Sequence, residues 1–537
     1  MRYVLHSQFR VALLLTAVLS LPAVGATQKK AHKKPKPEPS TIVIAVPEMV
    51  PGENSELPIT TSCEDARQFY LAAMVDWENL QTEHALEKWR AATEKDHDFA
   101  IAYLWISYYG QDPLEASDAR SKAKSLAMKV TSGEQLFIQW LTGVGDNDYV
   151  LGIAAMNDVL QRYPGDKRLA LMAGRWLMSQ QEYEASRKWL ERAIGLDANY
   201  AAPYNYLAYS YALSRDYVPA LAAGDRYIAL LPNEPNPQDS YAEILRMAGR
   251  YEEAVEHYRA ALQIDPKFHS SQLGIGDTYA LRGRERKARE EYFKARVLAT
   301  DKATEIQDAL QEALTYVRQK DFLGADNAFA GVAQQAHRAG LPMLEAEALR
   351  LRAELQLVSS PLDLTQAEPQ KSLRTRVLNL NRRPAGPVAL SYLDTAEQVL
   401  ADSKVISQVD RQEELARLLR LRAEWLARVG RITEARNSLR TLDAMVAGSR
   451  SRSLRSTSAG AQGAVLLYEG KYAEAIASLE LDPENPFSLY RLSVAYQQIG
   501  KPDLSQENQT LLLGLNSPSP EQALLLPVVR DKILAAK

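Results

Sequence analysis

Residues 235–268 read PNPQDSYAEILRMAGRYEEAVEHYRAALQIDPKF and predict two short helices separated by a turn at Gly249. Ala242 in the first helix and Ala254 in the second are small, so the two helices can approach closely, and the ring of Tyr251 fills the space beside them. Gly249 accepts the left-handed conformation that ends a helix. A single pair of this kind cannot bury its own apolar face, so we expect further pairs to stack against it.

The pattern recurs without a gap every 34 residues between residues 167 and 302. The eighth position of each unit holds a small residue, namely Gly174, Ala208, Ala242 and Gly276. Weaker copies extend the array on both sides, at residues 69–92, 103–127, 140–164, 313–329, 419–439, 463–475 and 492–500, before a final helix at 520–535. We therefore expect about ten antiparallel helix pairs.

At these positions the chain resembles the tetratricopeptide repeat (TPR), because residue type and spacing agree over four consecutive units. The resemblance implies an all-α fold, a right-handed superhelical solenoid in which the first helix of each pair lines an inner groove. We expect the TPR array to cover residues 63–358, with the clearest repeats at 167–302. Residues 359–390 contain four prolines and predict an irregular insertion, and residues 391–537 predict TPR-like repeats with a capping helix.

The N-terminal segment differs in composition from the array. A basic start and an apolar run that ends in small residues near Ala26 predict that residues 1–26 are a cleaved secretory signal peptide, with a retained anchor as the alternative. Residues 27–62 are rich in proline and lysine and predict an extended, solvated linker. The lysines of Lys29–Lys36 suit association with an anionic envelope surface. We expect an exported protein, either periplasmic or extracellular.

The composition argues against several classes of function. Of the 537 residues, 46% are hydrophobic and 24% are charged, as in a soluble folded chain. The net charge of −3 argues against general affinity for nucleic acid. The single cysteine, Cys63, excludes an intramolecular disulfide framework and cysteine-clustered metal sites. Because the sequence also lacks catalytic, metal-binding and cofactor motifs, we expect no enzyme activity, no metal and no cofactor.

The inner groove is the remaining place for a ligand. In tetratricopeptide arrays, ligand contacts commonly come from the second, fifth, ninth and twelfth positions of the first helix. The residues of this chain that the resemblance assigns to such contacts are Arg168, Arg175, Asn205, Tyr209, Asp239, Glu243, Arg246 and Asp277. They lead from a basic end past an aromatic residue to an acidic end, which suits a peptide or helix of opposite polarity. A solvated inner face that binds nothing is the alternative interpretation.

The resemblance and the missing motifs together predict a non-catalytic scaffold or adaptor that binds an unidentified protein or peptide. Two alternatives stay open. One is an accessory factor for cell-envelope assembly or polymer export, and the other is an enzyme or glycan-binding protein that uses residues 359–390. Residues 41–344 are net acidic whereas residues 345–455 are net basic, so self-association is a further expectation.

Overall fold

The computed structural model describes residues 56–535 except 111, 147, 360–384, 448 and 450. In this part of the chain every regular element is a helix, and the expectation of an all-α helical-repeat solenoid is confirmed. The predicted signal peptide, most of the linker with Lys29–Lys36, and most of the predicted insertion lie outside the described residues.

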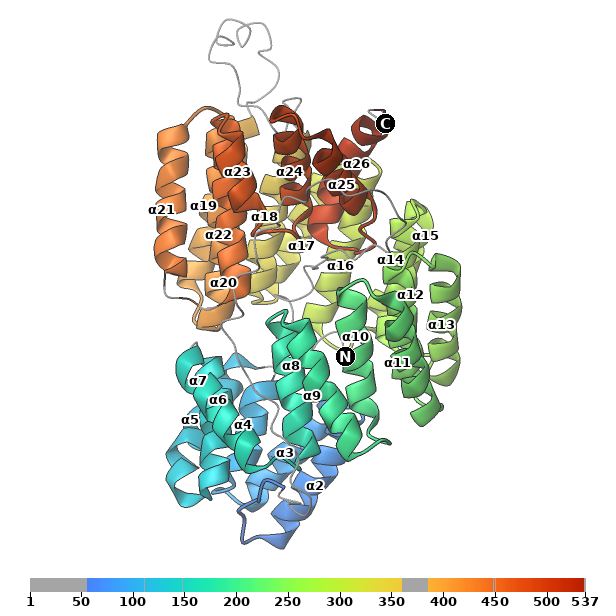
Figure 1. Cartoon of the computed structure of the whole chain (residues 1–537), viewed down its shortest axis with the longest axis vertical. Helices are drawn as coiled ribbons and strands as arrows, with labels where there is room; N and C mark the ends of the chain where they lie inside the picture. Colours follow the sequence, from blue (N-terminus) through green and yellow to red (C-terminus); the bar gives the residue numbers. More distant parts are fainter. Residues whose placement is uncertain are drawn as a thin grey trace, which may run out of the picture. The chain divides into compact units, whose positions relative to one another are not determined.

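The chain divides into two compact units, one ending at Pro232 and the other beginning at Asn233, and each is described by itself. Unit 1 contains five antiparallel pairs of α-helices, coloured blue to green in Figure 1, and a 3-10 turn, η1 (Ala127–Lys129). The pairs are α2 (Glu64–Glu78) with α3 (Thr82–Lys95), α4 (Ala100–Tyr109) with α5 (Pro113–Leu126), α6 (Ser132–Gly145) with α7 (Tyr149–Arg162), α8 (Lys167–Ser179) with α9 (Tyr183–Leu196), and α10 (Ala201–Leu213) with α11 (Tyr217–Leu230).

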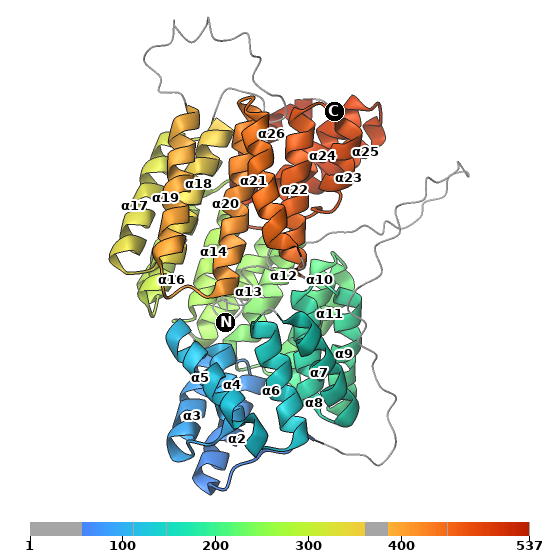
Figure 2. The same ribbon diagram turned by 90° about the vertical axis from the view of Figure 1, so that its left-hand side faces the viewer.

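Unit 2 contains seven pairs and a last single helix, and Figure 2 shows several of its helices side by side. The pairs are α12 (Pro235–Met247) with α13 (Tyr251–Ile264), α14 (His269–Leu281) with α15 (Glu285–Leu298), α16 (Lys302–Arg318) with α17 (Phe322–Arg338), α18 (Pro342–Ser359) with α19 (Ala385–Asp402), α20 (Gln408–Arg428) with α21 (Ile432–Val446), α22 (Arg452–Tyr468) with α23 (Tyr472–Leu479), and α24 (Pro486–Gln498) with α25 (Pro502–Leu513), followed by α26 (Pro520–Ala535).

The turns inside the pairs follow the expected backbone chemistry. Gly249 and Gly283 have φ angles of 77° and 70°, in the left-handed region that favours glycine. The equivalent turns of the two preceding repeats use Gln181 and Arg215, at φ angles of 61° and 59°. The repeat geometry therefore imposes the left-handed turn even where the sequence does not supply a glycine.

The described residues hold twelve helix pairs, where the sequence predicts about ten. One pair that the sequence patterns miss is α18 with α19, because α19 begins at Ala385, inside the predicted insertion 359–390. Pro387 lies in the first turn of α19, where proline is tolerated, so it does not end the helix. The apolar stripe of α19 includes Ala389, Leu393 and Leu400, all buried. The predicted insertion is therefore too long at its C-terminal end.

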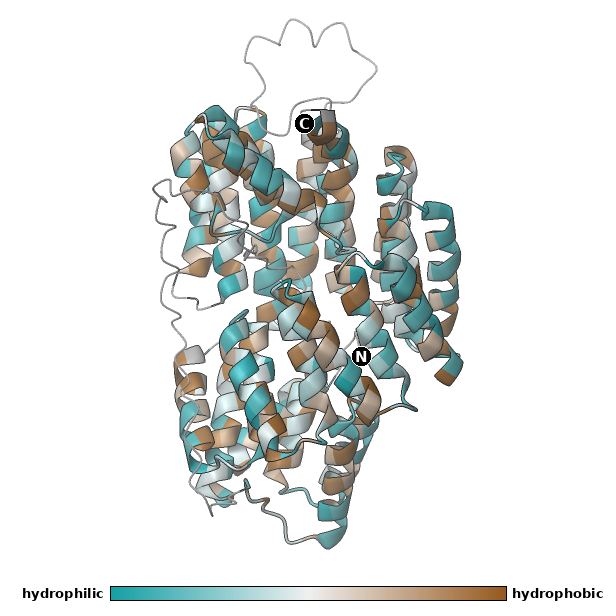
Figure 3. Cartoon of the chain, turned by 45° about the vertical axis from the view of Figure 1, so that its right-hand side comes forward, coloured by the Kyte–Doolittle hydropathy of each residue, from teal (hydrophilic) through white to brown (hydrophobic). Residues whose placement is uncertain are grey.

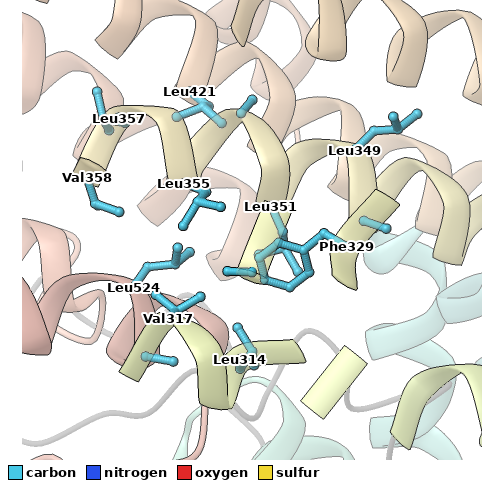
Figure 4. Packing of buried hydrophobic residues seen from close by; sticks show 14 of the residues in the cluster. Leu314, Val317, Phe329, Leu349, Leu351, Leu355, Leu357, Val358, Leu421 and Leu524 are labelled. Carbon is cyan, nitrogen blue, oxygen red and sulfur yellow. The ribbon is translucent and has the colours of Figure 1, made fainter. Parts of the chain in front are cut away.

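Helix α26 packs inside unit 2 instead of only ending the array. It contacts α16 and α18 as well as its neighbours α24 and α25. Figure 4 shows Leu524 of α26 beside Val317 of α16 and facing Leu355 of α18, and all three side chains are buried in one hydrophobic cluster. The expected capping helix is present as the last helix, and its apolar side chains also complete the core formed by helices about 200 residues earlier in the chain.

Figure 3 shows apolar and polar residues mixed along the helices of both units. Second helices such as α13 bury one stripe of side chains, whereas first helices such as α14 are buried at every residue from Ser270 to Ala280. None of the helices in the described part of the chain has the length and apolar character that a membrane span requires.

Candidate functional site

A short non-helical segment, residues 57–61, lies against the helices of unit 1. The backbone N–H of Leu57 donates to Oδ2 of Asp166 at 2.9 Å, and the backbone N–H of Thr60 donates to Oε1 of Glu134 at 2.7 Å. The hydroxyl of Thr61 donates to Oδ2 of Asp96 at 2.5 Å. The expectation of a solvated linker up to residue 62 is therefore corrected for this segment, which three separate parts of unit 1 hold in place.

Glu134 is the most deeply buried of these carboxylates, with 0% of its surface exposed. It belongs to a capping box at the start of α6, in which its side chain accepts from the backbone N–H of Thr131 and Thr131 caps the helix in return. Its two oxygens also accept from the backbone N–H of Thr60 at 2.7 Å and the hydroxyl of Thr60 at 2.6 Å. A buried carboxylate needs such donors, so Thr60 meets part of the hydrogen-bonding demand of Glu134.

Asp166 plays a similar double role at the start of α8. Its Oδ1 accepts from the backbone N–H groups of Arg168 at 2.8 Å and Leu169 at 3.0 Å, which caps the helix. Its Oδ2 takes no part in the cap and accepts from the backbone N–H of Leu57. The two bonds of Oδ1 to the helix N-terminus fix the orientation of this side chain, so that Oδ2 points to the segment.

The carbonyl groups of the segment are bound as well. The guanidinium of Arg67 in α2 donates to the carbonyl oxygen of Ile59 at 3.3 Å and to that of Thr61 at 2.9 Å. Unit 1 therefore binds both the N–H and the C=O groups of this segment, and most of these contacts do not depend on which side chains the segment carries.

The face that receives the segment is formed by the first helices of four successive pairs, α2, α4, α6 and α8, and we call it the first-helix face of unit 1. A small pocket that is partly open to solvent lies on it. Its lining consists of Leu57, Pro58 and Ile59 of the segment together with Tyr70, Met74, Ile101, Trp105, Phe137, Asp166, Arg168, Leu169 and Met172. The walls are mostly apolar, with Asp166 and Arg168 as the charged groups.

A cluster of aromatic rings makes the floor of this face rigid. Trp105 stacks on Trp89 with ring centroids 5.1 Å apart and contacts Phe137 at 5.8 Å. Its indole N–H donates to the hydroxyl of Tyr70 at 3.1 Å. Burial raises the pKa of Tyr70 well above its ordinary value, so this phenol stays neutral at physiological pH. Close-packed aromatic side chains of this kind have few alternative rotamers.

Arg175 of α8 is buried among further aromatic residues, two of which, Trp77 and Tyr109, contact Trp105. One of its Nη atoms donates to the hydroxyl of Tyr109 at 2.5 Å. The guanidinium lies 4.8 Å from the ring centre of Tyr206 and 5.7 Å from that of Trp77. Burial raises the pKa of Tyr206 to about 12. Because the guanidinium lies close to these aromatic rings, they stabilise its positive charge. The contacts of Arg175 join α8 to α2, α4 and α10.

The four predicted contact residues of unit 1 differ in accessibility. Arg168 lines the pocket and pairs through Nε with Glu78, and Tyr209 is partly exposed. Arg175 is 8% exposed and Asn205 is 1% exposed. The alternative of a solvated inner face is therefore wrong at Arg175 and Asn205. A role in ligand binding for the four residues stays a prediction.

The four predicted contact residues of unit 2 belong to a polar network between α12 and α14. Arg246 pairs with Asp277 at 2.9 Å and with Glu243 at 2.7 Å. Asp239 accepts from the hydroxyl of Ser271 at 2.7 Å. The acidic end that the sequence predicts is thus partly neutralised by Arg246, which is itself 3% exposed. These contacts join the first helices of neighbouring repeats, and a binding role for the four residues also stays a prediction.

Sequence reasoning missed the carboxylates that hold residues 57–61. Glu134 carries a signal, because Thr131 followed three residues later by Glu134 is a capping-box pattern. Asp166 carries another, because it directly precedes a clear repeat helix. Neither pattern indicates that the residue has a second partner far away in the sequence.

No group of three or more histidine, cysteine, aspartate or glutamate side chains that could hold a metal ion occurs among the residues that the structure describes. Residues 242–283 match a family model described as TPR repeat. Together with the helical pairs and the 34-residue period, this match shows that the chain contains tetratricopeptide repeats.

Solved structures that are similar to parts of the chain include a thermophilic TPR protein from Thermus thermophilus, at 22% identity over 34% of this chain and 98% of that one, with a TM-score of 0.29. Another is pilF of Pseudomonas aeruginosa, at 17% identity over 46% and 95%, with a TM-score of 0.30. A third is a tetratricopeptide repeat protein from Parabacteroides merdae, at 12% identity over 53% and 99%, with a TM-score of 0.33. The comparison with curated proteins finds no match.

Proposed function

We propose that this protein is a non-catalytic interaction scaffold that binds a peptide segment of another protein on the first-helix face of unit 1. The observation that carries the proposal is the segment 57–61, which already lies on this face as a bound peptide would. Its backbone N–H groups donate hydrogen bonds to Asp166 and Glu134, and its carbonyl groups accept hydrogen bonds from Arg67. Recognition through the main chain gives affinity, and pockets for the side chains give specificity.

The face has the properties of a prepared binding surface. Its acceptors are held by helix caps and its floor by packed aromatic rings, so little conformational entropy is lost when a ligand binds. Aromatic and arginine side chains are also those that contribute most to binding energy at protein interfaces.

The test is a selection of peptides on the full chain. Leu57→Asp and Ile59→Asp are introduced together, because carboxylates at these positions face the apolar pocket and Asp166 and should release the segment. Heptapeptides are then selected from a random display library, and their binding is measured by calorimetry. We expect micromolar ligands whose affinity falls at least tenfold when Glu134→Gln is added, because an NH2 group, which can only donate, then replaces one of the two carboxylate oxygens that accept from the ligand. Selected peptides that bind equally well after this change would locate the binding elsewhere.

We also propose that residues 1–26 direct export of the protein and that Lys29–Lys36 associate with the envelope surface. The alternative function is that of an accessory factor in envelope assembly or polymer export. The composition of these segments supports the proposal. N-terminal sequencing of the protein from envelope and soluble fractions tests it. A chain that starts at Met1 and is found in the cytosol would contradict it.

A further inference from the structure

Residues 57–60, Leu-Pro-Ile-Thr, contact the first-helix face as an intramolecular ligand would. We infer that this segment is an intramolecular competitor, and that the partner of the first-helix face presents the same pattern of aliphatic residue, proline, aliphatic residue and threonine. The inference rests on the proposed function and deepens it, because it names the chemistry of the partner and the step that must precede its binding.

The first argument is that the segment is held at the surface and is not part of a core. Residues 57, 59, 60 and 61 are all partly exposed, and Pro58 is exposed. The docked helix of unit 2 provides the contrast, since Leu524 and Leu525 of α26 are 0% exposed. Removing α26 would open a core, whereas removing residues 57–61 would uncover the apolar lining of one pocket and a few hydrogen-bonding groups.

The second argument concerns the side chains that the face can distinguish. The hydroxyl of Thr60 donates to Oε2 of Glu134 at 2.6 Å, in addition to the contact of its backbone N–H. A valine of the same shape would leave the buried carboxylate without one of its donors. Leu57 and Ile59 line the apolar pocket, and Pro58 restricts Leu57 to extended conformations. The preferred ligand is therefore aliphatic at the first and third positions and threonine at the fourth.

The third argument is the short connection to the helices. The segment is followed directly by α2, which begins at Glu64. A peptide tethered this closely acts at an effective concentration of about millimolar, so it competes strongly with a free ligand of equal contacts. The apparent affinity for a partner is then reduced by the fraction of molecules in which the face is open.

The experiment uses the full chain and a fluorescein-labelled, end-blocked peptide of residues 56–62, ELPITTS, in fluorescence anisotropy. The released variant carries Leu57→Asp and Ile59→Asp. The matched control carries Leu114→Asp and Val218→Asp, two aliphatic residues of unit 1 that are 58% and 82% exposed. We expect the released variant to bind the peptide at least tenfold more tightly than the unchanged chain or the control. A peptide with valine in place of Thr60 should bind the released variant about tenfold more weakly than the native peptide.

Three outcomes would overturn the inference: equal binding of the peptide by the released variant and the unchanged chain, equal binding of the native and valine peptides, or no binding to the released variant. The library selection described above separates this failure from failure of the proposed function. If library peptides bind the released variant and ELPITTS does not, only the inference is lost; if no peptide binds, both are lost. Circular dichroism and hydrogen exchange of α2 to α8 establish that the released variant is folded.

Discussion

The hydroxyl of Tyr251, the first residue of α13, donates to Oδ1 of Asn516 at 2.5 Å across a sequence separation of 265 residues. The side-chain N–H of the same Asn516 donates to the backbone carbonyl of Met247 at 3.2 Å. In most repeat arrays each repeat contacts only its neighbours. In unit 2 the chain after α25 instead returns to the first helix pair and leads α26 onto α16 and α18. The stability of unit 2 therefore depends on contacts between the two ends of its sequence.

Asn516→Ala should loosen α26. The change removes the hydrogen bonds to Tyr251 and Met247, which together contribute about 1 to 3 kcal/mol. Hydrogen exchange followed by mass spectrometry should show faster exchange of the α26 amides, with the amides of α2 to α11 unchanged. Asn508→Ala is the control, because the side chain of Asn508 donates only to Leu504 within α25. Equal effects of the two substitutions would mean that the long-range contacts do not hold α26.

Asp166→Ala should release residues 57–61 as well as weaken α8. Loss of the N-cap costs about 1 kcal/mol, and Leu57 loses its acceptor. Asp148→Ala is a matched change, since Asp148 caps α7 in the same manner through the backbone N–H of Leu151. We expect both variants to lower stability, but only Asp166→Ala to raise the exchange rate of the amides at 57–61. Protection of these amides in the Asp166 variant would show that this carboxylate is not needed to hold the segment.

Gly276→Ala should destabilise unit 2, although alanine is the better helix former. A Cβ atom at this position would lie 2.6 Å from Cδ1 of Tyr292, whose buried ring donates through its hydroxyl to Asp277. Displacing the ring costs about 1 to 3 kcal/mol, which outweighs the helix propensity of alanine. Gly195→Ala in α9 is the control, because nothing lies within 4 Å of its Cβ position, and it should be neutral or stabilising. Thermal unfolding monitored by circular dichroism measures both.

Glu413 should make the stability of unit 2 depend on pH. Burial raises its pKa from 4.5 to about 7, and the positive charge of Arg417 only partly opposes this effect. Because the pKa is higher in the folded state than in the unfolded state, the protonated Glu413 contributes stability that is complete below about pH 4.5 and is lost as the pH rises through about 7.

The measurement for Glu413 is urea unfolding of the protein and of Glu413→Gln at pH 5 and pH 8.5. Glutamine cannot ionise, so the variant should gain stability relative to the unchanged protein at the higher pH, by at most roughly 1.4 kcal/mol for each pH unit between the two pKa values. The Asp410 and Glu414 carboxylates, which act on the same group, are present in both proteins. An equal difference in stability at both pH values would show that Glu413 does not titrate in this range.

Part of the candidate site could be predicted from the sequence. The repeat register placed Arg168 and Arg175 on a first helix, and the structure shows Arg168 in the lining of a pocket and Arg175 among aromatic rings. The register could not show that Arg175 is buried, because burial depends on Trp77, Tyr109 and Tyr206 from three other helices. Local spacing specifies which face of a helix a side chain occupies, whereas its accessibility depends on the elements that cover that face.

The sequence by itself determined the all-α repeat, since the small residues, turn glycines and apolar stripes act within one helix pair and its neighbours. Only the tertiary structure decided which polar groups form hydrogen bonds and which residues are their partners. The contacts of Thr60 with Glu134 and of Tyr251 with Asn516 join residues 74 and 265 positions apart, and no local pattern encodes them. These long-range contacts form because the buried carboxylate of Glu134 and the half-buried amide of Asn516 bind the hydrogen-bonding partners that the folded chain brings to them.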